Sequence, residues 1–302
     1  MLTMRFSGVV AYPITPFAPG GAIDQVTFSA HIAALAESGV DGICVLGTAG
    51  SFAYLSHDER AAVVRTAVSA AAGSGIPIGV GVSALTTQQV LELAWDAENA
   101  GADGLVVNPL SYVPLLSPEI ADQVETVASS VSLPLCLDNN PSTTGFMYPV
   151  DLAAELTRVH NVVAFKDTAD SVRALHNRRR LLNQLCEPGT CFAIASPQLM
   201  MDDPDPTTAW HTGLAAALPQ EFVAFRAAAA ADDSEAVHRW REAFAPLIDV
   251  LRWERPLSSI YALNDVCGVR TAAPRRPIHP VTSQSRERIA EAVRVVRQAL
   301  AS

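Results

Sequence analysis

The chain of 302 residues has almost no lysine, since Lys166 is its only one and the other twenty basic residues are arginines. Basic residues are scarce overall, because 21 lysines and arginines stand against 31 acidic residues, which gives a formal net charge of −10. Nucleic acids and anionic membranes attract proteins through basic patches. The composition therefore argues against nucleic-acid and membrane partners.

Cysteine patterns are missing as well. The chain has five cysteines, an odd number, and no CxxC pair, so neither a disulfide framework nor a metal site is indicated. The apolar surroundings of Cys44 and Cys136 predict small core residues. No secretory signal or membrane-spanning stretch is visible, so a cytoplasmic location is the expectation. No GxGxxG or GxxxxGKS/T loop occurs either, which removes the main support for nucleotide binding.

What the chain does contain is an alternation of short apolar segments with longer helical ones. Uninterrupted apolar segments are typical of buried parallel strands, which helices cover on the outside. Seven strands are predicted at Gly8–Tyr12, Gly42–Leu46, Ile78–Val82, Gly104–Val107, Leu135–Leu137, Val162–Phe165 and Cys191–Ile194. A weaker segment near 208–213 adds an eighth. Helices are predicted between them at Gln25–Glu37, Asp58–Ala71, Thr87–Asn99, Pro118–Ser129, Pro149–Thr157 and Ser171–Leu182.

Eight strand–helix units predict a closed (β/α)8 TIM barrel, whereas fewer would leave an open sheet. The barrel core is assigned to residues 1–218. The remainder, 219–302, is interpreted as the last barrel helix and a C-terminal helical extension of the same structural unit. Its helices are predicted at Gln220–Ala231, Ser234–Leu251, Pro256–Val266 and Ser283–Ala301.

Lys166 directly follows the apolar segment Val162–Phe165, at the end of the predicted sixth strand. Catalytic residues of such barrels gather at the carboxyl ends of the strands. Burial favours the neutral form of an amine, and a neutral amine is a nucleophile suited to Schiff-base formation with a carbonyl compound. The alternative is a lysine that reaches solvent or forms a salt bridge, for instance with Asp167.

Other strand ends also carry candidate residues. The Gly47–Ser51 segment offers backbone N–H groups that suit a carboxylate or phosphate, although an ordinary tight turn has the same composition. Asp138 is expected beside Lys166, either as a general acid/base or as the partner in an inert ion pair. His211 is a candidate base or a polar loop residue. The remaining candidates at the ends of strands four, five and seven are Tyr112, Asn139 and Ser196.

Several landmarks occur together in a specific order and spacing. They are Thr15-Pro16-Phe17, Gly20 to Asp24, Gly47-Thr48-Ala49-Gly50-Ser51, Gly101-Ala102-Asp103-Gly104, Asn139 to Gly145 and Val162 to Asp167. Along nearly its whole length the chain resembles the dihydrodipicolinate synthase / N-acetylneuraminate lyase family. There the corresponding motifs are TPF, G.iD, GTTGE or GSTGE, GADG, YN.P.RTG and the strand that carries the imine-forming lysine.

The resemblance implies a homodimeric or homotetrameric Schiff-base enzyme that acts on pyruvate or another α-keto acid, with an aldehyde as candidate second substrate. Lys166 would form the imine, and no metal or organic cofactor would be needed. Thr48 would act with the loop residues Gly47, Ala49 and Gly50 on the keto-acid carboxylate. The resemblance implies further substrate contacts for Tyr112, Asn139, Thr143, Ser196 and His211.

Four positions depart from the family pattern. Asp138 stands in place of the catalytic tyrosine, and Ala49 replaces a hydroxyl residue of the carboxylate loop. Thr143 replaces the arginine that anchors the second substrate. Ser111, with Tyr112 next to it, replaces a tyrosine that is contributed across the dimer. These changes argue against a typical dihydrodipicolinate synthase.

The sequence therefore predicts a carbon–carbon or carbon–oxygen lyase or aldolase that uses Lys166, with Asp138 as its acid/base. One alternative is a diverged family member that binds small molecules or has a regulatory role. Another is an enzyme whose aldehyde substrate carries a cationic group drawn to Asp138 and to the acidic residues Asp202, Asp203 or Asp205.

Overall fold

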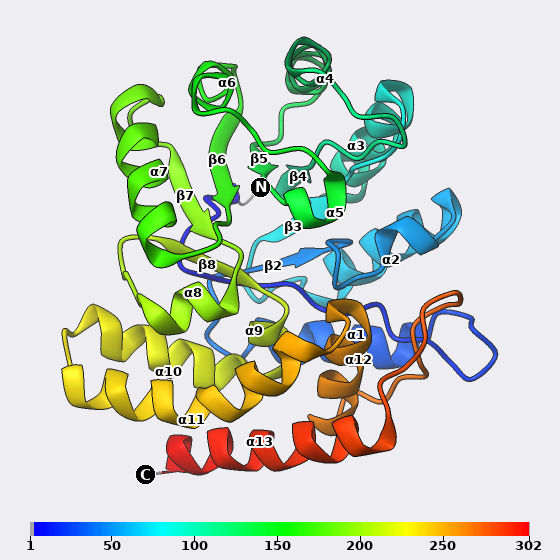
Figure 1. The fold of residues 1–302 in the computed structure, drawn as a ribbon. Coiled ribbons are helices and arrows are strands. Elements are labelled where there is room, and N and C mark those ends of the chain that lie inside the picture. The colour runs from blue at the N-terminus through cyan, green and yellow to red at the C-terminus, as the bar shows by residue number, and fades with distance from the viewer. Residues whose placement is uncertain (1–2, 302) are drawn as a thin grey trace.

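The computed structural model describes residues 3–301, which form a closed barrel of eight parallel strands surrounded by helices (Figure 1). Each strand pairs with the next, and the last closes the barrel on the first. This confirms the predicted (β/α)8 TIM barrel, including the weakly signalled eighth strand. The strands are β1 (Val9–Ala11), β2 (Gly42–Val45), β3 (Ile78–Gly81), β4 (Gly104–Val107), β5 (Leu135–Asp138), β6 (Val162–Asp167), β7 (Cys191–Ile194) and β8 (Ala209–Thr212).

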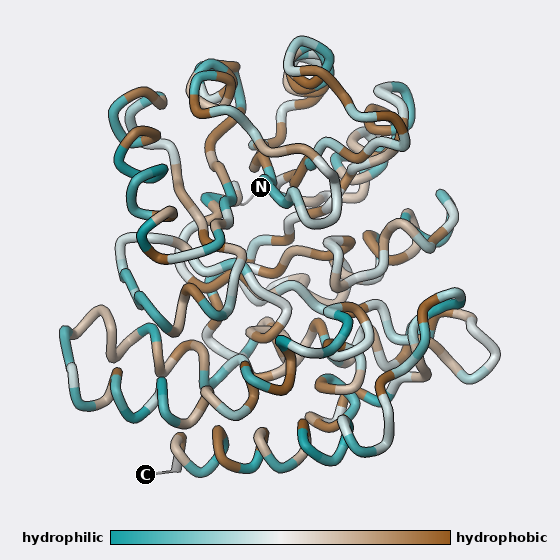
Figure 2. The backbone as a smooth tube through the Cα atoms, in the orientation of Figure 1, coloured by the Kyte–Doolittle hydropathy of each residue, from teal (hydrophilic) through white to brown (hydrophobic). Residues whose placement is uncertain are grey.

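The strands form because their residues are apolar on both faces. Outward-facing residues such as Val9 join the large core beneath the helices. Inward-facing residues such as Val10, Cys44 and Cys136 fill the barrel together with Met4, as expected for the two cysteines. Figure 2 shows hydrophobic segments gathered along the strands and hydrophilic ones on the outer turns of the helices.

The helices lie where the periodicity predicts them, with additional short ones. The short helices α5, α8 and α9 span only four to six residues, too few to show helical periodicity in a sequence. The helices are α1 (Gln25–Ala36), α2 (His57–Ala70), α3 (Thr87–Ala100), α4 (Ser117–Ser130), α5 (Pro141–Thr144), α6 (Val150–Leu156), α7 (Val172–Leu185), α8 (Pro197–Asp202), α9 (Leu214–Ala217), α10 (Pro219–Ala230), α11 (Ser234–Trp253), α12 (Pro256–Val266) and α13 (Ser283–Ala301), with the 3-10 turn η1 (Phe52–Tyr54).

The C-terminal helices α10 to α13 lie together along one side of the barrel (Figure 1). Helix α13 packs against α11 and α12, and α10 contacts β1. The boundary assigned at 218/219 falls between α9 and α10. Within residues 3–301, no helix combines the length and apolarity needed to cross a membrane.

His31 on α1 is a buried histidine whose Nε2 atom has no hydrogen-bond partner. Burial lowers the pKa of His31 from 6.5 to about 4. Across this pH window the unfolded chain binds a proton at His31 that the folded chain does not bind. Acidification from about pH 6.5 towards about pH 4 therefore favours unfolding, and the stabilisation is fully present only above that window.

We expect His31→Leu to weaken this pH dependence, because leucine takes up no proton. Between about pH 7 and about pH 4 the free energy of unfolding should fall less in the variant than in wild type, by up to about 3 kcal/mol. Urea unfolding followed by circular dichroism measures both slopes. His160→Leu is the control, because His160 is exposed. Equal slopes in wild type and His31→Leu would contradict the expectation.

Candidate active site

Two ionisable side chains meet inside the carboxyl end of the barrel. Lys166 of β6 and Asp138 of β5 occupy paired positions, and Lys166 Nζ lies 3.1 Å from Asp138 Oδ2. Their exposed fractions are only 8% and 4%. The proximity that the sequence predicted is therefore present, as a buried and hydrogen-bonded ion pair.

A shift in strand register creates this pairing. Leu135 lies opposite Val162, but the next residue, Cys136, lies opposite Ala164, so one residue of β6 is skipped. An extra residue of this kind is a β-bulge, which changes the alignment of all later residues. Without it Asp138 would lie opposite Phe165 instead of Lys166, and the two charged groups would not share one face.

Asp138 keeps one oxygen free. Its Oδ1 atom is buried and has no hydrogen-bond partner among the described residues. Leaving a buried acceptor unpaired costs about 1–3 kcal/mol, so such an atom marks a place where a substrate group can bind. Asp138 thus holds the amine with one oxygen and offers the other to a reactant.

Tyr12, which sequence analysis did not select, completes the interior of the site. Its ring centroid lies 4.6 Å from Lys166 Nζ, and its hydroxyl lies 3.1 Å from Nδ1 of His211. The inward direction of Val10 could have indicated Tyr12, because side chains two residues apart in an extended chain face the same side.

His211 is a buried, neutral histidine whose two ring nitrogens are both bonded. Burial lowers its pKa to about 3. Its Nε2 lies 2.8 Å from the carbonyl oxygen of Phe6, so Nε2–H is the donor there. Nδ1 must then accept the hydroxyl proton of Tyr12. His211 therefore contacts Tyr12 directly.

The Gly47–Ser51 segment is held as a fixed turn. Thr15 Oγ1 donates to the carbonyl oxygen of Gly50 at 2.8 Å. The Ser51 hydroxyl lies 2.9 Å from the hydroxyl of Tyr261, which donates to the carbonyl oxygen of Thr15 at 2.7 Å. This rigid turn is suited to present its backbone N–H groups to an anion.

Two glycines allow other residues to approach this turn closely. A Cβ atom on Gly47 would lie 2.7 Å from Cδ1 of Tyr12, so the tyrosine ring rests directly on the turn. A Cβ atom on Gly81 would lie 2.2 Å from the carbonyl oxygen of Leu46. A side chain at Gly47 would push against the ring of Tyr12, and one at Gly81 would push against the backbone at the start of the turn.

Asn139 lies next to the ion pair, but its side chain is engaged outside the barrel interior. Its Nδ2 donates to Asp167 Oδ1 at 2.7 Å, and its Oδ1 accepts the N–H of Tyr148 at 3.1 Å. Asp167 also accepts from Arg178 Nε at 2.7 Å. Successive strand residues point to opposite faces, so Asp167 points away from Lys166. The alternative salt bridge between Lys166 and Asp167 is therefore wrong.

A pocket of about 560 Å³ opens beyond the strand ends, between η1, α5 and the start of α12. Thr48 and Thr143 both line it, and Arg255 is the charged residue of its lining, whereas Lys166 and Asp138 are not part of it. The other two candidates lie elsewhere. Tyr112 is 93% exposed, and Ser196 caps α8 by accepting the N–H of Leu199.

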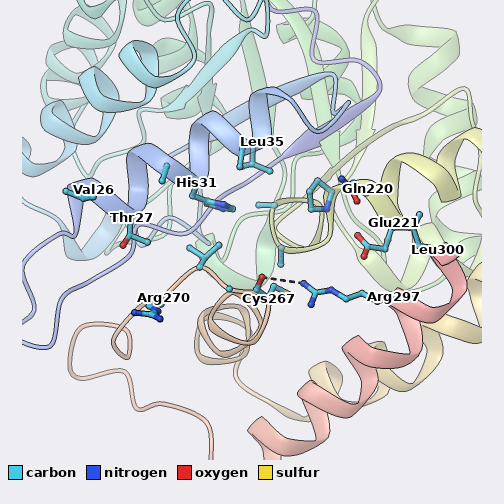
Figure 3. Close-up of a pocket in the computed structure, with 17 residues that line it drawn as sticks. Val26, Thr27, His31, Leu35, Gln220, Glu221, Cys267, Arg270, Arg297 and Leu300 are labelled. Carbon is cyan, nitrogen blue, oxygen red and sulfur yellow. Dashed lines mark hydrogen bonds between the residues drawn. The ribbon is translucent and has the colours of Figure 1, made fainter.

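A separate groove of about 830 Å³ lies outside the barrel, between α1, α10 and the C-terminal helices (Figure 3). His31 and Glu221 line it, and Arg297 donates across it to the carbonyl oxygen of Cys267 at 3.4 Å. It shares no lining residue with the pocket at the strand ends, so it is not part of the Lys166 site.

The model of the dihydrodipicolinate synthetase family matches residues 5–192. The chain belongs to this family. Relatives of the chain include proteins named as synthases, aldolases and a lyase. This confirms the resemblance on which the expected lyase chemistry rests.

Individual relatives match over different lengths. An uncharacterized DapA-like lyase of Rhizobium meliloti is 31% identical over 196 residues, which cover 65% of this chain and 64% of the relative. A 4-hydroxy-tetrahydrodipicolinate synthase of Methanosarcina mazei is 27% identical over 293 residues, 96% of this chain and 98% of the relative. Three of the relatives, the Rhizobium meliloti lyase among them, are matched over only 64%, 54% and 57% of their own length.

Solved structures share the whole fold. The dihydrodipicolinate synthase of Agrobacterium tumefaciens superimposes with a TM-score of 0.91 at 31% identity, covering 97% of this chain and 98% of that one. The Escherichia coli protein YagE, in complex with pyruvate, gives a TM-score of 0.89 at 24% identity over 97% and 99%. The second likeness concerns the fold alone.

Proposed function

We propose that this protein is a class I lyase or aldolase in which Lys166 forms an imine with an α-keto acid, pyruvate first among them. The observation that carries the proposal is the buried Lys166–Asp138 pair at the carboxyl end of the barrel, with Asp138 Oδ1 left free. Family membership supports the reaction class, and two relatives named as aldolases of 2-dehydro acids, which are α-keto acids, support the substrate class.

Asp138 has the position needed to move the protons of this reaction. Proton transfer from Lys166 to Asp138 gives a neutral amine, which attacks the keto carbon. Asp138 gives that proton to the former carbonyl oxygen and then relays a second proton from the nitrogen to the same oxygen, which leaves as water, so that an iminium remains. The iminium withdraws electrons, so a carbon–hydrogen or carbon–carbon bond at the adjacent carbon can break. The free Oδ1 of Asp138 accepts the proton that this step releases.

The other proposed roles follow from position. The fixed Gly47–Gly50 turn with Thr48 would hold the keto-acid carboxylate, and the pocket lined by Thr143 would receive an aldehyde. We also propose a cytoplasmic homodimer or homotetramer. The adjacent apolar residues Tyr112, Val113 and Leu116 are 93%, 68% and 66% exposed, and a second copy would cover them.

The alternative is a diverged family member that binds small molecules or has a regulatory role. One observation favours it, because Lys166 is absent from the lining of the pocket at the strand ends. Its amine instead contacts Asp138 and the ring of Tyr12. Trapping the imine separates the two functions.

Pyruvate and borohydride should add one reduced adduct to the intact protein, and peptide mapping should place it on the segment Val162–Asp167. Because Lys166 is the only lysine, only the N-terminal amine competes. Lys166→Arg is the control, since it keeps a positive charge beside Asp138 but lacks a nucleophilic amine. A folded wild-type protein that remains unmodified by a panel of α-keto acids would favour the binding-protein alternative.

Asp138→Asn should lower turnover by about 100-fold to 10,000-fold, because it keeps the size of the side chain and removes the acid. Adduct formation on Lys166 should persist, though more slowly. Steady-state kinetics and borohydride trapping measure the two effects. Asp167→Asn removes the neighbouring carboxylate, which faces away from Lys166, and should retain turnover. Wild-type turnover in Asp138→Asn would make Asp138 a structural residue.

Pyruvate with aspartate semialdehyde should give negligible turnover, because Thr143 cannot provide the two-pronged hold of an arginine on a carboxylate. A coupled assay for the condensation product tests this, with an authentic dihydrodipicolinate synthase as positive control. Efficient product formation would refute the expectation. Arg255 would then be the candidate anchor, and Arg255→Gln should raise KM for the semialdehyde.

A further inference from the structure

Three contacts fix the ring of Tyr12 beside the Lys166 amine. The ring centroid lies 4.6 Å from Nζ, the ring rests on the backbone of Gly47, and the hydroxyl is bonded to His211. Tyr12 is 4% exposed, so ring and amine are both largely removed from water. A cation within about 6 Å of an aromatic centroid is attracted to the ring, most strongly where water is excluded.

The hydroxyl of Tyr12 is not a free proton donor. The neutral His211 accepts its proton at Nδ1 while donating from Nε2 to Phe6. Burial raises the pKa of Tyr12 well above its ordinary value of 10.0. The phenol therefore stays neutral, and what it offers Lys166 is the π face of its ring.

The other titratable groups that face this amine are neutral apart from one. Burial raises the pKa of Cys44 on β2 to about 12 and that of Cys136 on β5 well above its ordinary value, so both remain thiols. His211 on β8 is neutral as well. Among the described residues, Asp138 is therefore the charged neighbour of Lys166 inside the barrel, and the Tyr12 ring is its aromatic neighbour.

We propose that the Tyr12 ring is a catalytic residue that stabilises the cationic nitrogen of Lys166, first as ammonium and then as the iminium formed with the keto acid. The iminium part rests on the function proposed above. Imine formation leaves the positive charge on the same nitrogen, so the ring and Asp138 continue to face it. The electrically neutral enamine that follows has no such attraction, and the ring therefore favours the electron-withdrawing state.

The single lysine allows a direct test. In protein labelled with 15N-lysine, Lys166 gives the only side-chain amine signal of that residue type, and its titration can be followed by NMR. Tyr12→Phe keeps the ring and removes the hydroxyl, whereas Tyr12→Leu removes the ring. We expect the midpoint pH of the Lys166 signal to fall by about 0.4 to 1.5 units in Tyr12→Leu and to stay at the wild-type value in Tyr12→Phe.

An unchanged midpoint in Tyr12→Leu would overturn the proposal, and so would an equal shift in both variants, which would assign the effect to the hydroxyl. Thermal unfolding checks that both variants fold. If Tyr12→Leu does not, Tyr12→Met provides the ring-free comparison with a longer apolar side chain.

Borohydride trapping with pyruvate in the same variants tests the iminium. We expect Tyr12→Leu to form the adduct about 2-fold to 30-fold more slowly than Tyr12→Phe, which keeps the ring. Equal rates in these two variants would overturn the iminium part. A wild-type protein without any adduct would instead refute the proposed function, while the NMR midpoint would still decide whether the ring holds the ammonium.

Discussion

The buried ion pair between Lys166 and Asp138 is the constraint to which the rest of the barrel mouth is fitted. Two charges removed from water are costly unless they are paired and hydrogen-bonded. Here the pair has one direct bond and one aromatic face, and residues 3–301 place no other charged neighbour beside it inside the barrel. Because both groups are buried, a reactant that breaks the bond between the Lys166 amine and Asp138 must supply a new partner for the charge. An α-keto acid carries a carboxylate that can serve as this partner.

The surroundings of the pair are built from neutral contacts. Tyr12, His211 and the carbonyl of Phe6 form a hydrogen-bonded chain that joins β1, β8 and the segment before β1. The cysteines Cys44 and Cys136 fill the space beside it without charge. Because the interior adds no further charge, the electrostatics at Lys166 are set by Asp138 and by the ring of Tyr12.

The departure from the family pattern at Asp138 is accompanied by an aromatic residue on another strand. Where the resemblance places a catalytic tyrosine, β5 carries Asp138, and an aromatic ring reaches the same amine from the end of β1. On β5, the carboxylate of Asp138 thus stands where the family has a phenol. At the end of β1, Tyr12 supplies a phenol whose proton is donated to His211. In the proposed mechanism, the proton-moving and cation-stabilising tasks are divided between two strands.

The sequence by itself determined the barrel, the place of Lys166 at the end of β6 and its proximity to Asp138, because these follow from the apolar periodicity and strand order. Tertiary structure alone decided that Asp138 lies opposite Lys166 and bonds its amine, since the shift in register between β5 and β6 sets that alignment. It alone also placed Tyr12 in the site. Tyr12 and His211 are 199 positions apart, and barrel closure brings them within 3.1 Å. Such contacts depend on strand register and on closure of β8 onto β1, which no local pattern of residues encodes.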